Sequence, residues 1–356
     1  MRLRVTNAIS IAVALCLVRP SLGQQPAPDL VLFNGKIFTC SSARPYAEAL
    51  AVRGERIVAV GGSREVLALA DQASRRIDLA GRTVIPGIND AHLHMAVEPK
   101  HYDLALNGTD PAWPEIIDAL AAATGRVRKG TWITGVFGPS LFDDPHATRT
   151  ALDATAPDHL VALWDWTGHA VLLNTPAMRS LNVGEDEQNP QAGVYVRNAR
   201  NGPLTGMALE YAKFRVDRKY MRLVSDEDAI SQIHEFFTQT ARWGITTVQD
   251  MASVIPPDRL MTWFERAPPE VRVRVIWFGL TDEHGRLINQ GHASNTRSLP
   301  LVSVSGTKWI LDGTPIERSA AMRQPYADGS STSGELNFSE AEMEQMLLES
   351  IKARIN

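Results

Sequence analysis

The chain has 356 residues, of which 44% are hydrophobic and 21% charged, and its formal net charge is −4, which is typical of a globular protein with a sizeable core. This balance excludes a mainly disordered chain and argues against a nucleic-acid-binding protein that relies on basic residues. A scaffold held by disulfides is excluded as well, because the sequence contains only Cys16 and Cys40.

The first 23 residues have the pattern of a secretory signal peptide. A basic start (1–4) precedes the apolar run 8–18, and Ser21 and Gly23 place small residues where a signal peptidase cuts. The apolar run is shorter than the roughly 20 residues of a membrane-spanning helix. We therefore expect cleavage and export to the periplasm or the medium, without a stable membrane span, and an uncleaved anchor is the alternative.

Residues 24–83 predict a small β-domain. They contain short apolar runs separated by tight turns, and Asn34-Gly35 between the runs 30–33 and 36–39 is a hairpin signal. Such a meander has the size of half a small β-sandwich, which is marginal if left alone.

From residue 84 onward the pattern changes to that of an α/β fold. Residues 84–94 predict a buried strand that ends in polar side chains, and residues 95–243 mix helix and strand signals as a long α/β insertion. After the insertion we expect, in chain order, a strand at 244–250, a helix at 257–266, strands at 271–278 and 303–313, and a helix at 338–354. Strands that alternate with helices indicate a parallel sheet or a barrel.

Two histidines close the strand 84–94. His92 and His94 are two residues apart, so on a strand both imidazoles project from the same face and can reach one metal ion. A solvated strand end or a hydrogen-bonded pair would give the same pattern, and chance His-x-His pairs are common. The position favours a metal site, because catalytic side chains of β/α barrels lie at the carboxyl ends of the strands.

The segment Val84 to His94, V-I-P-G-I-N-D-A-H-L-H, resembles the signature of the metal-dependent amidohydrolase superfamily. Further stretches around His169 and at 244–247, 308–313 and 317–328 are similar to its amidohydrolase-3 branch, the exoenzyme-like and N-substituted formamide deformylase-like proteins. The resemblance covers nearly the whole chain after the leader. It implies a TIM-like (β/α)8 barrel that holds one or two divalent metal ions, for which we expect zinc.

The resemblance also implies metal ligands. His92 and His94 match the histidines of the first barrel strand, and Lys308 matches a lysine of the fourth strand that is often carbamylated and bridges two metals. Independently, an ammonium in the apolar strand around Lys308 is costly unless it is neutralised, and desolvation lowers the pKa of a lysine. A neutral amine can capture carbon dioxide and become an anionic ligand. The alternative is a lysine that extends to water from the strand end.

Three further residues are candidates for substrate binding or for support of the metal ligands. His169 resembles a family histidine expected near the substrate, although an isolated histidine is often structural. Asp250 ends a predicted strand beside the metal histidines, and Asp312 should share the face of the fourth-strand lysine because of its even spacing. Glu210 resembles the family more weakly and could be a solvated helix residue, and the cluster 164–166 would line the pocket or pack in the core.

The family mechanism requires ligands that this sequence does not contain. It uses histidines on strands five and six and an aspartate on strand eight, which acts as the general base. No histidine follows His292, and the expected barrel segments amount to about half of the ~250 residues of this fold. We therefore expect residues 84–356, with the insertion 95–243, to form an incomplete barrel of about four β/α units, and the general base to lie beyond residue 356.

The sequence thus predicts a hydrolase that cleaves a carbon–nitrogen bond of a small, non-peptide, amide-type substrate by means of metal-activated water. The alternative is a truncated, non-catalytic remnant or a binding module of the same family.

Overall fold

The computed structural model describes residues 26–199, 202–281, 287–288 and 299–352. The chain divides into two compact units between Pro86 and Gly87. The expected signal peptide, residues 1–23, lies outside the described residues. In the part of the chain that is described, no helix is long and apolar enough to cross a membrane.

The first unit contains two small sheets of short strands, with the orders β5-β4-β1-β6 and β3-β2-β7. Its elements are β1 (Leu30–Phe33), β2 (Lys36–Phe38), β3 (Tyr46–Ala47), β4 (Ala49–Arg53), β5 (Arg56–Gly61), α1 (Ser63–Leu67), β6 (Arg75–Asp78) and β7 (Thr83–Val84). The hairpin predicted at Asn34-Gly35 is wrong, because β1 pairs with β4 and β6 whereas β2 pairs with β3 and β7. The turn instead leads the chain from one sheet to the other, with Gly35 packed closely against Leu79.

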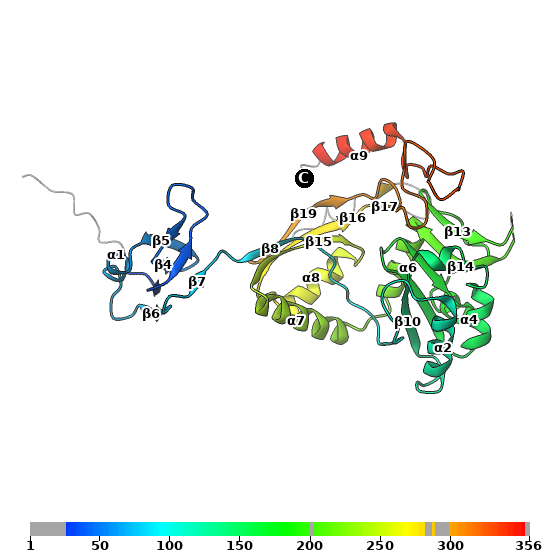
Figure 1. Cartoon of the computed structure of the whole chain (residues 1–356), viewed down its shortest axis with the longest axis horizontal. Helices are drawn as coiled ribbons and strands as arrows, with labels where there is room; N and C mark the ends of the chain where they lie inside the picture. Colours follow the sequence, from blue (N-terminus) through cyan, green and yellow to red (C-terminus); the bar gives the residue numbers. More distant parts are fainter. Residues whose placement is uncertain (1–25, 200–201, 282–286, 289–298, 353–356) are drawn as a thin grey trace, which may run out of the picture. The chain divides into compact units, whose positions relative to one another are not determined.

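The second unit is built around a parallel sheet of four strands in the order β19-β16-β15-β8. These strands are β8 (Ile88–Leu93), β15 (Ile245–Ser253), β16 (Arg272–Phe278) and β19 (Val302–Lys308). Helices α7 (Asp226–Arg242) and α8 (Pro257–Arg266) lie on one side of this sheet (Figure 1). Phe237 of α7 and Trp263 of α8 are buried in one cluster with Val248 and Val273 of the strands, so this layer is held by apolar packing.

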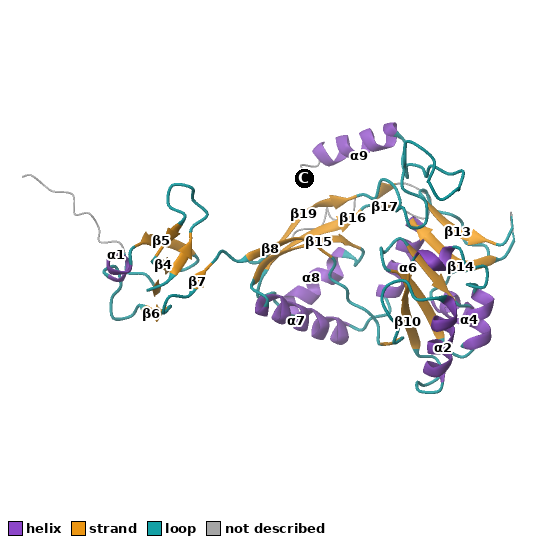
Figure 2. Ribbon diagram, in the orientation of Figure 1, coloured by secondary structure: helices purple, strands orange, loops and turns teal. Residues whose placement is uncertain are grey.

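Residues 101–221 of the predicted insertion form a second, six-stranded sheet in the order β13-β14-β12-β11-β10-β9, flanked by helices (Figure 2). Its strands are β9 (His101–Asp103), β10 (Trp132–Phe137), β11 (Leu160–Asp165), β12 (Ala170–Leu173), β13 (Gly193–Arg197) and β14 (Leu204–Glu210). Its helices are α2 (Trp113–Thr124), α3 (Pro139–Phe142), α4 (Arg149–Thr155), α5 (Thr175–Ser180) and α6 (Tyr211–Met221). Helix α7, the last helix of the predicted range 95–243, packs on the parallel sheet instead. The predicted α/β class is therefore confirmed.

The remaining elements follow β16 and β19. They are the strands β17 (Leu280–Thr281) and β18 (Leu287–Ile288) and the helix α9 (Glu340–Lys352). The helix begins at a capping box, in which the backbone N–H of Glu342 donates to Oγ of Ser339 and the backbone N–H of Ser339 donates to the Glu342 carboxylate, at 3.3 and 2.7 Å.

The parallel register gathers the carboxyl ends of the sheet at one edge. Asp250 of β15 lies opposite Leu93 of β8, and Phe278 of β16 lies opposite Lys308 of β19. The pairing of β15 is irregular on both sides of Asp250. Such irregularities redirect side chains next to functional sites, so the sheet places its polar residues where a site can form.

The start of α7 offers a test of its local stability. Ser225 is the N-cap, and its Oγ accepts a hydrogen bond from the backbone N–H of Asp228 at 3.1 Å. Ser225→Ala should lower the free energy of unfolding by about 1 kcal/mol, because that N–H loses its partner. Ser225→Thr keeps the acceptor and should stay near the wild type in urea denaturation. Equal losses in both variants would contradict this account of the cap.

Candidate functional site

A cavity of about 550 Å³ lies at the carboxyl ends of the parallel strands, between them and the insertion. Five of the residues selected from the sequence line it together, namely His92, His94, His169, Asp250 and Lys308. The structure therefore unites side chains that come from β8, β15, β19 and the insertion.

His92 and Lys308 meet although their strands form opposite edges of the sheet. Nε2 of His92 and Nζ of Lys308 are 3.3 Å apart. Neighbouring strands are spaced by about 4.8 Å, so the backbones of β8 and β19 would lie roughly 14 Å apart in a flat sheet. The sheet must therefore curve toward the cavity, and both side chains lie on its concave side.

His94 is oriented by the neighbouring strand. Its Nδ1 lies 2.8 Å from the backbone carbonyl oxygen of Met251, so Nδ1 carries the hydrogen and Nε2 is left as a lone-pair donor. Burial and the positive charge of Lys308 lower the pKa of His94, which favours the neutral form that binds metals. The ring centroids of His92 and His94 are 5.3 Å apart with an interplanar angle of 69°, so the two imidazoles meet edge to face at the strand end.

Burial also lowers the pKa of Lys308, so the neutral amine that carbamylation requires forms more readily than in a fully exposed lysine. An ammonium would repel a metal cation held by the two histidines, whereas an amine converted to a carbamate supplies an oxygen anion. Two imidazole nitrogens and such an oxygen are a donor set that suits a divalent transition metal, so the residues present fit the expected metal.

Asp250 lies almost completely buried beside this group. Its Oδ1 accepts a hydrogen bond from the backbone N–H of Met95 at 2.9 Å, and its Oδ2 has no hydrogen-bond partner among the described residues. Burial raises the pKa of Asp250 to about 7. The carboxylate holds the backbone that follows His94, and its role as a support for the metal histidines stays a prediction.

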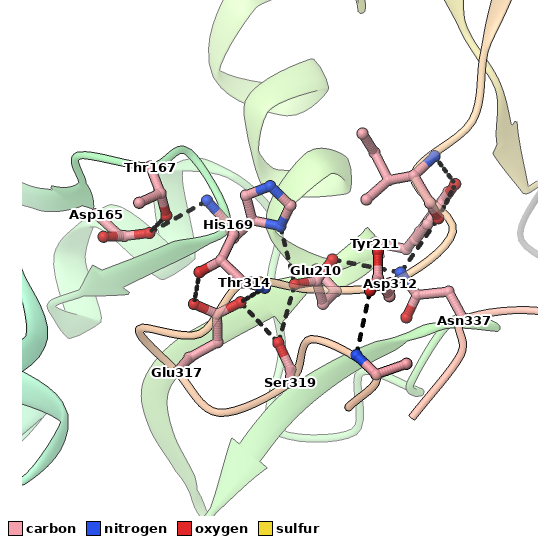
Figure 3. A network of polar contacts seen from close by, with 12 residues as sticks. Asp165, Thr167, His169, Glu210, Tyr211, Asp312, Thr314, Glu317, Ser319 and Asn337 are labelled. Atoms are coloured by element: carbon pink, nitrogen blue, oxygen red, sulfur yellow. Dashed lines mark hydrogen bonds and ion pairs between the residues drawn. The ribbon is translucent and has the colours of Figure 1, made fainter. Parts of the chain in front are cut away.

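His169 belongs to a second polar network on the insertion side of the cavity (Figure 3). Its Nδ1 lies 2.9 Å from Oε1 of Glu210, and ligand-type atoms of His169, Glu210 and Glu317 all lie within 4.8 Å of one another. Ser319 links the two carboxylates through Oγ, at 2.6 Å from Glu317 and 3.4 Å from Glu210. The described residues thus offer two groups of metal-binding type, of which sequence reasoning selected the first and part of the second.

Asp312 does not join the cavity, contrary to the prediction from its spacing. The strand β19 ends at Lys308 instead of continuing to residue 313, so the alternation of faces stops before Asp312. The ring of Trp309 lies against Gly279 at this point, and Asp312 accepts a hydrogen bond from the backbone N–H of Ala321 at 3.1 Å. Its observed contact stabilises the loop that follows β19.

Sequence reasoning missed a buried ion pair in the cavity wall. On α6, Nζ of Lys213 lies 2.7 Å from Asp217, and both residues line the cavity. The ammonium also lies over the rings of Trp164 and Phe214, at 5.5 and 5.3 Å from their centroids. The four-residue spacing was the available signal, although such pairs usually lie on exposed helix faces.

Comparisons with known proteins agree with these features. A family profile described as "Amidohydrolase family" matches residues 75–353. The N-substituted formamide deformylase of Arthrobacter pascens is 27% identical over 229 residues, which cover 62% of this chain and 42% of that protein. The putative amidohydrolase YtcJ of Bacillus subtilis is 26% identical over 313 residues, which cover 85% of this chain and 57% of that protein. The chain spans about half the length of these curated relatives.

Two solved structures share the fold. An uncharacterized metal-dependent hydrolase from Pyrococcus horikoshii superposes with a TM-score of 0.61 at 19% identity, covering 92% of this chain and 64% of that chain. An uncharacterized metal-dependent hydrolase from Pyrococcus furiosus has a TM-score of 0.59 at 21% identity, covering 92% of this chain and 66% of that chain.

Proposed function

The chain belongs to the amidohydrolase family, as the resemblance of its motifs predicts and the match of residues 75–353 confirms, and on this premise we propose that its cavity serves the hydrolysis of a carbon–nitrogen bond in a small, non-peptide, amide-type substrate. The observation that carries the proposal is the meeting of His92, His94 and Lys308 at the carboxyl ends of parallel strands, within one cavity. The name of one relative, an N-substituted formamide deformylase, supports the amide-type substrate. The activity and substrate of the whole protein are part of this proposal.

The four-stranded parallel sheet is proposed to be the first part of a TIM-like (β/α)8 barrel. The curvature that brings His92 of β8 to Lys308 of β19 supports this, since a barrel closes by curving its sheet. The position of the cavity at the carboxyl ends of the strands supports it too, because active sites of this fold lie there.

A divalent metal, zinc in this proposal, would be held by Nε2 of His92, Nε2 of His94 and a carbamate on Lys308. When bound, the metal supplies a Lewis acid that lowers the pKa of a water molecule and polarises the substrate carbonyl. The chain's own contribution is to orient the ligands: the carbonyl of Met251 fixes the ring of His94, and Asp250 fixes the backbone at Met95.

The insertion side of the cavity would hold the substrate. The rings of Trp164 and Phe214 supply apolar walls, and the ion pair of Lys213 with Asp217 supplies a polar patch. An apolar wall with a few fixed polar groups is typical of a small-molecule site.

The carbamate on Lys308 gives the proposal a direct test. The purified chain, loaded with Zn²⁺ in ¹³C-bicarbonate, should show a carbamate carbonyl resonance that is absent from Lys308→Arg. Arginine keeps the positive charge but cannot be carbamylated, so the affinity for Zn²⁺ should fall about 100-fold. Lys308→Glu returns a carboxylate near the same place and should recover part of this affinity.

Turnover is measured on the same samples with N-formyl and N-acyl amides, by the release of amine. Release that depends on Zn²⁺ and falls in Lys308→Arg supports a hydrolase. Full metal loading with a carbamate signal but without amine release would overturn the enzymatic proposal and favour the alternative, a binding module or non-catalytic remnant of the family.

A further inference from the structure

Glu210 has an unusual conformation at the junction of β14 and α6. It is the last residue of β14, and its backbone has φ 52° and ψ −128°, a left-handed region that residues other than glycine avoid. Its side chain is buried, with the residue 6% exposed. A strained backbone persists where the surrounding contacts enforce it, and such residues concentrate at functional sites.

Two hydrogen bonds tie Glu210 to His169. The backbone N–H of Glu210 donates to the backbone carbonyl oxygen of His169 at 2.8 Å, and Oε1 of Glu210 lies 2.9 Å from Nδ1 of His169. Burial raises the pKa of Glu210 overall, while the hydrogen bond and charge of His169 oppose this and stabilise the ionised form. The ionised carboxylate only accepts, so in this pair Nδ1 of His169 carries the hydrogen. Figure 3 shows the other ring nitrogen of His169 directed away from Glu210, and His169 lines the cavity.

The carboxylate of Glu210 is itself fixed by the segment that follows Lys308. Nδ2 of Asn337 donates to Oε2 of Glu210 at 3.4 Å. Oγ of Ser319, whose single hydrogen is directed to Glu317 at 2.6 Å, lies 3.4 Å from Oε1 of Glu210. A side chain at Gly313 would collide with Glu210 and Ser319, so the loop approaches the carboxylate as closely as its backbone allows. The loop after β19 thus holds the carboxylate of Glu210 in one orientation.

The charges around His169 favour a hydrogen on both ring nitrogens. Burial alone lowers the pKa of His169, but the hydrogen bond and charge of Glu210, together with the charge of Glu317, raise it overall. Lys213 opposes this from α6. The charged imidazole donates at Nε2 as well as at Nδ1.

We propose that Glu210 is a positioning residue that holds the imidazole of His169 so that Nε2 donates a hydrogen bond to the carbonyl oxygen of the substrate in the cavity. This inference rests on the proposed function, because it assumes an amide-type substrate. The family resemblance already implies a place for His169 near the substrate, and the new assignment is the role of Glu210, which acts through His169.

The rival interpretation is a second metal site formed by His169, Glu210 and Glu317. The contacts of Glu317 favour the hydrogen-bonded network. Its Oε1 accepts from the backbone N–H of Thr314 and from Oγ of Ser319, both at 2.6 Å, and its Oε2 accepts from the hydroxyl of Thr314. This carboxylate is already engaged by donors of its own loop.

The first experiment is ¹⁵N NMR of the histidine rings in the full chain, with chelator present. In the wild type, both ring nitrogens of His169 should carry a hydrogen, and an Nε2 without one would overturn its role as a donor to the substrate. Glu210→Leu removes the acceptor, so His169 should shift toward the Nε2–H tautomer, while the conservative Glu210→Gln should retain Nδ1–H. Glu335→Gln, an exposed carboxylate of the same C-terminal segment, is the matched control and should leave the His169 signals unchanged.

Unchanged His169 signals in Glu210→Leu would overturn the positioning role. Zn²⁺ that shifts the His169 signals in a His92→Ala, His94→Ala background would also overturn it, in favour of the second metal site. Since neither readout requires turnover, these failures are distinguishable from a failure of the proposed function, which would be the absence of amine release by the metal-loaded wild type.

The second experiment measures kinetics on the metal-loaded chain. Glu210→Leu should lower kcat about tenfold with little change in KM and in metal content, and Glu210→Gln should recover part of the loss. His169→Gln should lower kcat at least as much, and adding Glu210→Leu to it should cause no further loss, because one residue acts through the other. Losses that multiply in the double variant would show that Glu210 acts independently and would overturn the proposal.

Discussion

Replacing His92 and His94 together with alanine should lower the affinity of the chain for Zn²⁺ by at least about 100-fold, since even the outer partners of metal ligands contribute 10- to 100-fold. The physical reason is that both imidazoles end on the concave side of one curved sheet, next to Lys308. The lysine that remains supplies no imidazole lone pair and cannot hold the ion alone. Competition with a chromophoric chelator measures the affinity, and elemental analysis measures the bound metal.

The matched control is the double variant His146→Ala, His234→Ala, which removes two exposed histidines outside the cavity. It should bind Zn²⁺ as the wild type does. If the variant without His92 and His94 retains its metal while His169→Ala loses it, the ion belongs to the network of Glu210 and Glu317, and the assignment of the metal centre is wrong.

Asp250→Asn should make the metal-free chain more stable than the wild type above neutral pH. In the unfolded chain an aspartate releases its proton near its ordinary pKa of 3.8, whereas burial raises the pKa of Asp250 to about 7 in the folded state. Between these values the folded state keeps a proton that the unfolded state has lost, so the free energy of unfolding falls as the pH rises. At 1.36 kcal/mol for each pH unit, the loss between about pH 4 and pH 7 amounts to roughly 4 kcal/mol at most.

The asparagine variant lacks this titration, so its advantage should be absent near pH 4 and grow up to pH 8. Urea denaturation in the presence of a chelator, repeated across this range, measures the difference. Asp118→Asn, which changes an exposed carboxylate on α2, is the control and should follow the wild type at every pH. A constant gap between Asp250→Asn and the wild type would contradict the explanation from burial.

The α/β class and the pairing of His92 with His94 on one face of a strand could be predicted from the sequence because each depends on a local rule. Alternating strands and helices indicate a parallel sheet, and the parallel direction brings all carboxyl ends to one edge. The identity of the lysine came from the family resemblance, and the structure places its Nζ 3.3 Å from His92.

The network of Glu210 could not be predicted in the same way. Its members come from β14, from the turn before β12 and from the loop after β19, and only the tertiary fold makes them neighbours. The expected hairpin at Asn34-Gly35 and the expected reach of β19 to residue 313 were wrong for a related reason. Each rule considers only a short segment of sequence. The partners that β1 and β2 pair with, and the end of β19 where Trp309 packs on Gly279, depend instead on residues that are distant in the sequence.

The contact of His92 with Lys308 joins two points that are 216 residues apart in the sequence. A metal bound there would act as a crosslink across most of the second unit, including the whole insertion. It would bind only when both edge strands are in place, so its free energy of binding would add to the free energy of folding. Metal supply would then set the lifetime of the folded chain, and metal-starved chains would be cleared by proteases before those that are loaded.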